Sequence, residues 1–228
     1  MTKHFSWELF NRIPVVGILR NVAIEDVKVL AGFYQESGLT TIEVTMNSAG
    51  AAEMISHLSG TYSGKLNIGA GTVCTMADLD EALSAGATFV VTPIVNEEVI
   101  KTCVAKDIPV FPGAFTPTEI YKAWSLGAEM IKVFPATQLG AAYIKDVLAP
   151  LPQVKLIPTG GVSLENFADF LKAGAKGLGM GSTLFPQQLI KEKNWEELEN
   201  LFVKLVEKYG QYVKKTGAER QMPSDLLL

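Results

Sequence analysis

The amino-acid sequence predicts an α/β protein, a (β/α)8 barrel (TIM barrel) with an extra N-terminal helix. Short apolar runs rich in β-branched residues alternate with longer stretches whose apolar residues recur at helical spacing. Such alternation is typical of a parallel sheet with right-handed crossovers. Eight units fit within the 228 residues, which lies near the lower end of the length range of this fold.

The strands are predicted where an apolar run is short and bounded by turn-forming residues. In chain order they are Pro14–Arg20, Thr41–Thr45, Leu66–Gly69, Phe89–Thr92, Pro109–Phe111, Met130–Phe134, Lys155–Pro158 and Gly177–Met180. A helix is predicted between each strand and the next. These helices are Ile24–Ser37, Ala49–Leu58, Met76–Ser84, Asn96–Lys106, Thr118–Ser125, Gly140–Leu148 and Leu164–Ala173.

Four glycines support a repeating unit. Gly38, Gly86, Gly127 and Gly174 each follow a predicted helix and precede an apolar run. Glycine supplies the left-handed residue at which many helices end. The recurrence therefore indicates the same helix-to-strand turn every second unit.

Both ends of the chain lie outside the eight units. Residues 1–12 are predicted to form the N-terminal helix, which we expect to plug the bottom of the barrel. Trp195–Val213 has one apolar face and is predicted to be a helix. Residues 214–228 are expected to be a frayed tail. No linker divides the chain, so 1–228 is predicted to be a single domain.

Composition excludes several classes of protein. A hydrophobic fraction of 48% rules out disorder for most of the chain. No apolar run approaches the ~20 residues that span a bilayer, and the N-terminus lacks the apolar core of a secretory signal. Only Cys74 and Cys103 are present, so we expect a reducing cytoplasm and no disulfide scaffold.

Charge and metal-ligand patterns exclude further partners. The net charge is −4 and the basic residues form no stripe, so nucleic acid is not an expected partner. His4 and His57 lie far apart, and acidic residues do not cluster at strand ends. We therefore expect neither a metal nor a cofactor.

Lys132 and Glu43 are charged residues inside apolar runs that are predicted to be strands. Burial lowers the pKa of a lysine, and a neutral amine can form a Schiff base with a ketone. A carboxylate beside the imine can move protons. The structural alternatives are a lysine whose head reaches solvent and a buried ion pair.

Function in a barrel lies at the carboxyl ends of the strands, with phosphate bound after strands 7 and 8. Glycine pairs follow both of those predicted strands, and glycine lets backbone N–H groups approach an anion. An arginine such as Arg20 can clamp a carboxylate through two hydrogen bonds. The candidate substrate-binding residues are Arg20, Thr72, Pro93, Phe134, Thr159, Gly160, Gly161, Gly181 and Ser182.

Seven short motifs in order carry a family resemblance over about residues 10–210. They are IEVT (42–45), GAGTV (69–73), VTP (91–93), FPG (111–113), IKVFPA (131–136), PTGG (158–161) and GMGS (179–182). The sequence resembles the 2-keto-3-deoxy-6-phosphogluconate (KDPG) aldolases, also called 4-hydroxy-2-oxoglutarate (KHG) aldolases. The resemblance implies a metal-independent class I aldolase that forms a homotrimer of barrels. The implied reaction is reversible cleavage of the keto-deoxy sugar phosphate to pyruvate and glyceraldehyde 3-phosphate.

The resemblance also assigns roles to residues. It places the Schiff-base lysine at Lys132, the general acid/base at Glu43 and the threonine of the pyruvate pocket at Thr72. Phosphate contacts fall on Gly160, Gly161, Gly181 and Ser182.

One position departs from the family pattern. Many members carry a carboxylate-binding arginine two residues after the threonine of the EVT motif, where this sequence has Asn47. Arg20 is the candidate replacement. Its GILR segment, together with Asn47-Ser48, is similar to the branch that acts on 2-keto-3-deoxy-6-phosphogalactonate.

Other functions stay open at this point. The substrate can be the gluconate- or the galactonate-derived compound, or 4-hydroxy-2-oxoglutarate, which would give pyruvate and glyoxylate. From other classes, the alternatives are a sugar-phosphate isomerase or epimerase and a non-catalytic barrel that binds a phosphosugar.

Overall fold

The computed structural model describes residues 4–217. Within that range the chain alternates between strands and helices, as predicted. The strands are β1 (Val15–Leu19), β2 (Thr41–Thr45), β3 (Asn67–Gly71), β4 (Phe89–Val91), β5 (Val110–Phe111), β6 (Gly113–Ala114), β7 (Ile131–Val133), β8 (Leu156–Pro158) and β9 (Leu178–Met180).

All strand pairs are parallel, which confirms the predicted α/β class. Their hydrogen bonds form two sheets, with the orders β5-β4-β3-β2-β1-β9 and β6-β7-β8. A single bridge from Thr159 to Gly179 joins β8 to β9. The first strand thus lies between β2 and the last strand, β9.

The predicted count of eight strands needs correction. Residues 113–114 form β6, which the sequence did not predict, directly after Pro112. Proline has no N–H group to donate to a strand ladder, so it interrupts pairing there. The strands therefore pair as two sheets and not as one continuous ladder of eight.

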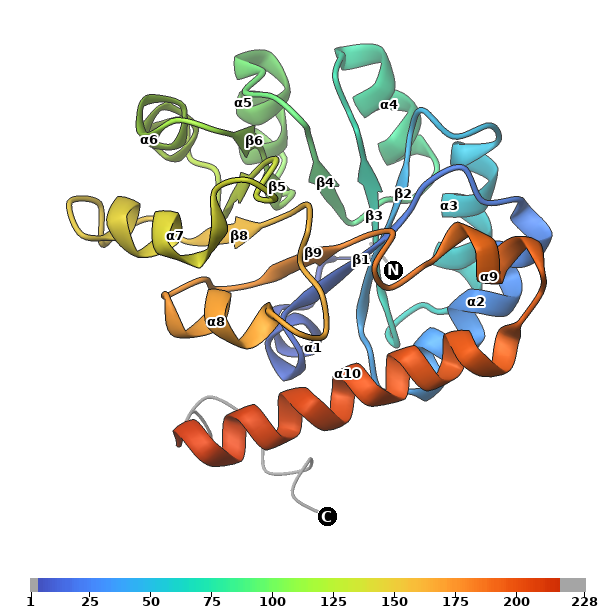
Figure 1. Cartoon of the computed structure of the whole chain (residues 1–228). Helices are drawn as coiled ribbons and strands as arrows, with labels where there is room; N and C mark the ends of the chain where they lie inside the picture. The colour runs from blue at the N-terminus through green and yellow to red at the C-terminus, as the bar shows by residue number, and fades with distance from the viewer. Residues whose placement is uncertain (1–3, 218–228) are drawn as a thin grey trace.

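Helices surround the strands (Figure 1). They are α1 (Trp7–Arg12), α2 (Ile24–Glu36), α3 (Ala51–Thr61), α4 (Met76–Ser84), α5 (Glu97–Ala105), α6 (Pro117–Ser125), α7 (Gly140–Leu148), α8 (Phe167–Lys172), α9 (Gln187–Lys191) and α10 (Trp195–Thr216). None of those described is long and apolar enough to cross a membrane.

Two predictions at the chain ends need adjustment. The N-terminal helix predicted for 1–12 spans Trp7–Arg12, after its cap Ser6, and residues 4–6 are not helical, while residues 1–3 lie outside the described part of the chain. Helix α10 continues to Thr216, so residues 214–216 are helical and not part of a frayed tail. Residues 218–228 lie outside the described part of the chain. The short helix α9 was not predicted, because five residues are too few to show helical periodicity.

Local sequence fixes the ends of the helices. α4 and α6 each begin with a reciprocal capping box, formed by Thr75 with Asp78 and by Thr116 with Glu119. The four glycines after helices adopt positive φ, from 94° at Gly38 to 107° at Gly174, which confirms their predicted role.

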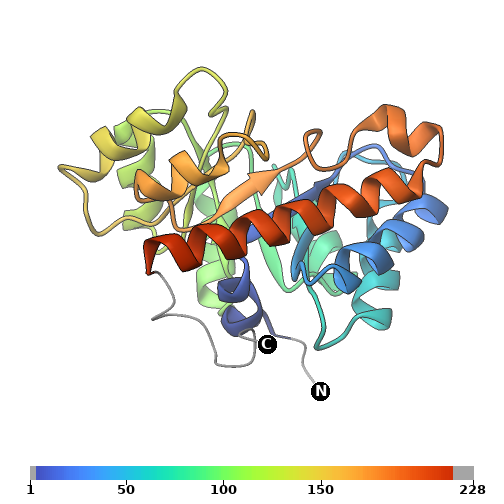
Figure 2. The ribbon, with the colours of Figure 1, turned by 60° about the horizontal axis from the view of Figure 1, so that its bottom comes forward.

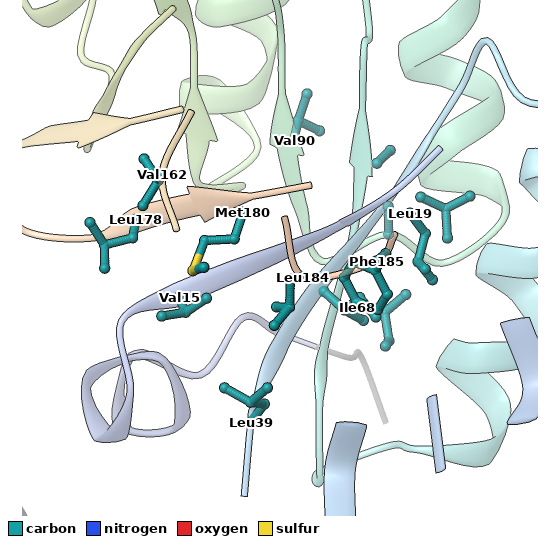
Figure 3. Close-up of a cluster of buried hydrophobic side chains, with 14 of the residues drawn as sticks. Val15, Leu19, Leu39, Ile68, Val90, Val162, Leu178, Met180, Leu184 and Phe185 are labelled. Atoms are coloured by element: carbon teal, nitrogen blue, oxygen red, sulfur yellow. The ribbon is translucent and has the colours of Figure 1, made fainter. Parts of the chain in front are cut away.

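Side chains alternate between the two faces of each strand. Val15 and Leu19 of β1 belong to the large core shared with the helices, as does Leu178 of β9, which pairs with Val15. Figure 3 shows part of this core. The intervening residues, such as Val16, face the interior enclosed by the strands. Lys132 and Glu43 occupy interior positions of the same kind.

The amino ends of the strands are covered by α1 (Figure 2). Asn67, the first residue of β3, accepts a hydrogen bond of 2.7 Å from the Ser6 N–H and donates one of 2.9 Å to the Ser6 carbonyl. The contact is aromatic: Phe5, Trp7 and Phe10 pack against Phe89 of β4 and Phe111 of β5. The expected plug is therefore present.

Candidate active site

Lys132 and Glu43 are the central residues of β7 and β2, and both side chains are buried. Only 3% of Lys132 and 1% of Glu43 is exposed. Both line one small interior cavity of about 10 Å³, whose other lining residues include Val16, Ile18 and Ile157. The structure thus brings together the two charges that the sequence placed in separate apolar runs.

Burial shifts both groups toward their neutral forms. It raises the pKa of the Glu43 carboxyl, and the positive charges of Lys132 and Arg20 oppose the rise. It lowers the pKa of the Lys132 amine, while the Glu43 charge opposes this change and Arg20 adds to it. A lysine with a lowered pKa carries more of the nucleophilic free amine at neutral pH.

The Glu43 carboxylate has an unused hydrogen-bond acceptor. Its Oε2 atom is buried and accepts no hydrogen bond from the residues described. No ion pair within 4.0 Å joins it to Lys132 in the same part of the chain. A buried acceptor without a partner is costly. The carboxylate is therefore available to a hydroxyl or water that enters the interior.

Gly71 provides the room for this carboxylate. A Cβ atom at Gly71 would lie 2.4 Å from Oε1 and 2.7 Å from Cδ of Glu43. Because Thr45 of β2 pairs with Gly71 of β3, this backbone stands directly beside the carboxylate-bearing strand. Any larger residue at position 71 would displace Glu43.

A cavity of about 410 Å³ opens above the amine at the carboxyl ends of the strands. Lys132 forms part of its lining, and its Nζ lies 4.8 Å from the centre of the Phe134 ring. The predicted residues that line this cavity are Arg20, Lys132, Phe134, Thr159, Gly160, Gly161, Gly181 and Ser182. A volume of this size accommodates a small ligand.

The two glycine loops form one side of the cavity. The Thr183 hydroxyl donates to the Val162 carbonyl at 2.6 Å and so joins them. The N–H groups of Gly160, Gly161 and Ser182 donate no backbone hydrogen bond within residues 4–217. Free N–H groups on glycine loops are suited to binding an anion.

The family model described as "KDPG and KHG aldolase" matches residues 8–201 of this chain. The chain belongs to the KDPG and KHG aldolase family. The earlier resemblance, based on seven short motifs, is thereby confirmed.

Relatives and solved structures agree. The chain is 34% identical to 2-dehydro-3-deoxy-6-phosphogalactonate aldolase of Escherichia coli, over 79% of this chain and 87% of that protein. It is 33% identical to 2-dehydro-3-deoxy-phosphogluconate aldolase of Haemophilus influenzae, over 88% and 94% of the two chains. A Legionella pneumophila KDPG aldolase solved with pyruvate captured as a covalent carbinolamine has a TM-score of 0.80 at 29% identity, over 86% and 96%.

Thr72 and Pro93, two of the predicted substrate-binding residues, line neither of these two cavities. Thr72, with a φ of 57°, lies beside the site, where the Arg20 guanidinium reaches its hydroxyl at 3.5 Å. Pro93 lines neither cavity. Its carbonyl group packs against Gly113, where a Cβ atom would lie only 2.5 Å from the carbonyl oxygen. Asn47 is exposed and also outside both cavities.

Sequence reasoning missed several residues that line the larger cavity: Ile18, Asn21, Val162, Thr183, Phe185 and Gln187. Strand alternation identifies Ile18 in retrospect, because it is two residues from Val16 on β1. Gln187 gave no signal, since it begins a short polar helix that was not predicted.

Proposed function

We propose that this protein is a class I aldolase that cleaves a 2-keto-3-deoxy-6-phospho sugar acid to pyruvate and glyceraldehyde 3-phosphate. One observation carries the proposal: the Lys132 amine and the Glu43 carboxylate are buried together below the cavity. The family relationship and the covalent carbinolamine of the Legionella relative support the same chemistry. The route uses side chains alone, without a metal or cofactor.

Each step has a group to perform it. The neutral Lys132 amine attacks the C2 ketone and, after loss of water, forms an iminium. Glu43 takes the proton of the C4 hydroxyl as the C3–C4 bond breaks, and the bonding electrons move into the iminium to give an enamine. The aldehyde leaves, C3 is protonated and water releases pyruvate. The unpaired Glu43 Oε2 accepts the C4 hydroxyl proton and then returns a proton to C3 of the enamine.

The two ends of the substrate are assigned to different groups. The phosphate is bound by the N–H groups of the loops at Gly160–Gly161 and Gly181–Ser182. The substrate carboxylate is bound by Arg20. Arg20 and Lys132 are the basic residues among those described around the cavity, and Lys132 is assigned to the ketone. Holding both ends fixes C3 and C4 beside the amine.

Borohydride trapping tests the proposal. Reduction in the presence of pyruvate should leave a pyruvate-derived adduct on the Lys132 peptide, detected by mass spectrometry. Lys145 on the outer helix α7 is the control peptide and should stay unmodified. An unmodified Lys132 peptide at saturating pyruvate would overturn the Schiff-base mechanism. Pyruvate release coupled to lactate dehydrogenase separates an aldolase from a non-catalytic binding barrel.

The galactonate-derived compound is the second candidate substrate. Arg20 lines the cavity and Asn47 does not, which supports Arg20 as the replacement for the carboxylate-binding arginine and hence the similarity to the galactonate branch. Curated relatives of both kinds match the chain at similar identity. Measuring kcat/KM for both epimers, with 4-hydroxy-2-oxoglutarate as a third substrate, decides among them, because discrimination is a ratio of these values.

The proposal includes the closed barrel, the single domain and the homotrimer. Continuity from β5 to β6 across Pro112 and the Thr159–Gly179 bridge support closure of the two sheets into one barrel. The trimer rests on the family relationship, and sedimentation equilibrium tests it.

A further inference from the structure

The peptide unit between Arg20 and Asn21 is held at both ends by other parts of the chain. Its carbonyl accepts a hydrogen bond of 3.1 Å from Nε2 of Gln187, the first residue of α9. Its N–H donates one of 2.9 Å to Oγ of Ser48, which follows β2. Ser48 is fixed in turn by the Thr45 hydroxyl at 2.9 Å.

This peptide unit lies where the backbone needs support. Asn21 has a φ of 53°, a left-handed conformation that is uncommon outside glycine and that asparagine adopts more often than most other residues. Such a residue persists when its surroundings hold it in place. The two hydrogen bonds fix the plane of the peptide, and this plane sets the direction in which the Arg20 side chain leaves the backbone.

We propose that Gln187 is a positioning residue for carboxylate recognition: through the Arg20 carbonyl it aims the Arg20 guanidinium into the cavity. The inference rests on the proposed function, in which Arg20 binds the substrate carboxylate. Gln187 itself lines the cavity, and 167 residues separate it from Arg20 in sequence. Gln188, the next residue, serves as a control. It is also exposed, and its amide donates a hydrogen bond to Glu192 and not to Arg20.

The test measures the pyruvate concentration that gives half-maximal borohydride trapping on Lys132. Pyruvate has a carboxylate and no phosphate, so the glycine loops do not contribute. Gln187→Ala should raise this concentration about three- to tenfold, the value of one hydrogen bond, and leave the maximal trapping rate unchanged. Gln187→Glu keeps the size of the side chain but loses the N–H donor. It should raise the half-maximal pyruvate concentration at least as much as Gln187→Ala. Gln188→Ala should match the wild type.

A double-mutant cycle with Arg20→Met separates positioning from a structural role. If Gln187 acts through Arg20, Gln187→Ala should have no further effect in the Arg20→Met protein. The preference for pyruvate over uncharged pyruvamide should fall in Gln187→Ala at an unchanged Tm. Equal effects of the Gln187 and Gln188 variants, or additive effects of Gln187→Ala and Arg20→Met, would overturn the inference and leave the aldolase mechanism standing. Absence of any adduct in the wild type would overturn both.

Discussion

The two ends of the strands enclose very different interiors. At the amino ends, five aromatic side chains pack in contact, with the Phe5 and Phe89 rings 5.3 Å apart and the Phe89 and Phe111 rings 5.6 Å apart. At the carboxyl ends, a cavity of about 410 Å³ reaches down to an amine and a carboxylate. The two ends therefore contribute differently. Packing at the amino ends stabilises the fold, whereas burial of ionisable groups at the carboxyl ends lowers stability.

The largest effect on activity is expected from removal of the Lys132 amine. Lys132→Met should abolish the pyruvate adduct and cleavage, because methionine has no nucleophile. Replacing both buried groups, in Lys132→Met/Glu43→Leu, should leave the free energy of unfolding unchanged or raise it by about 1–4 kcal/mol, since apolar residues of similar size replace a buried pair. Urea unfolding measures the change. A loss of stability in the double variant would mean that the buried pair supports the fold.

The converse change removes an aromatic ring at the opposite end. Phe89→Ala should lower the free energy of unfolding by about 3–5 kcal/mol, because the ring is fully buried among other rings. Adduct formation per folded molecule should be retained. Val203→Ala on the exposed face of α10 is the control and should change stability by no more than about 0.5 kcal/mol. Loss of the adduct in fully folded Phe89→Ala would contradict the separation of the two ends.

A subtler variant acts at Gly71, the last residue of β3. Gly71→Ala should displace the Glu43 carboxylate and lower kcat by up to about 10²-fold, because a shift of about 1 Å in a catalytic group can cost that much. Gly60→Ala is the matched control, since a Cβ at Gly60 in α3 meets no atom within 4 Å. Equal kcat values in the two variants would show that the room at Gly71 is not needed for catalysis.

The smallest expected effect is a change in pH dependence. The negative charge of Glu43 raises the pKa of Lys132, whereas Arg20 lowers it. Glu43→Gln should therefore lower the pKa of Lys132, so that the trapping rate begins to rise at a lower pH. Arg20→Met should raise this pKa, so that the trapping rate begins to rise at a higher pH. Initial trapping rates across pH measure both. Shifts in the same direction would contradict the electrostatic account.

The sequence predicts the parts of this molecule that repeat or break a pattern. β2, α4 and α7 have the predicted bounds, because their periodicity is regular and their flanks are clear. Lys132 and Glu43 are recognisable since a charge inside an apolar strand is rare. β6 and α9 are too short for a periodic signal. The contact of Gln187 with Arg20 depends on two segments at opposite ends of the chain, which no local pattern connects.

The place of β1 between β2 and β9 has a consequence for synthesis of the chain. The ribosome makes the N-terminal strands first, so Val15–Leu19 emerges long before Leu178–Met180. Throughout that interval the edge of β1 that later pairs with β9 presents unpaired backbone groups, and such an edge is a template for pairing with other chains. β1 is therefore made well before its partner β9, and its uncovered edge, beside Arg20, gives other chains a place to pair with the growing polypeptide.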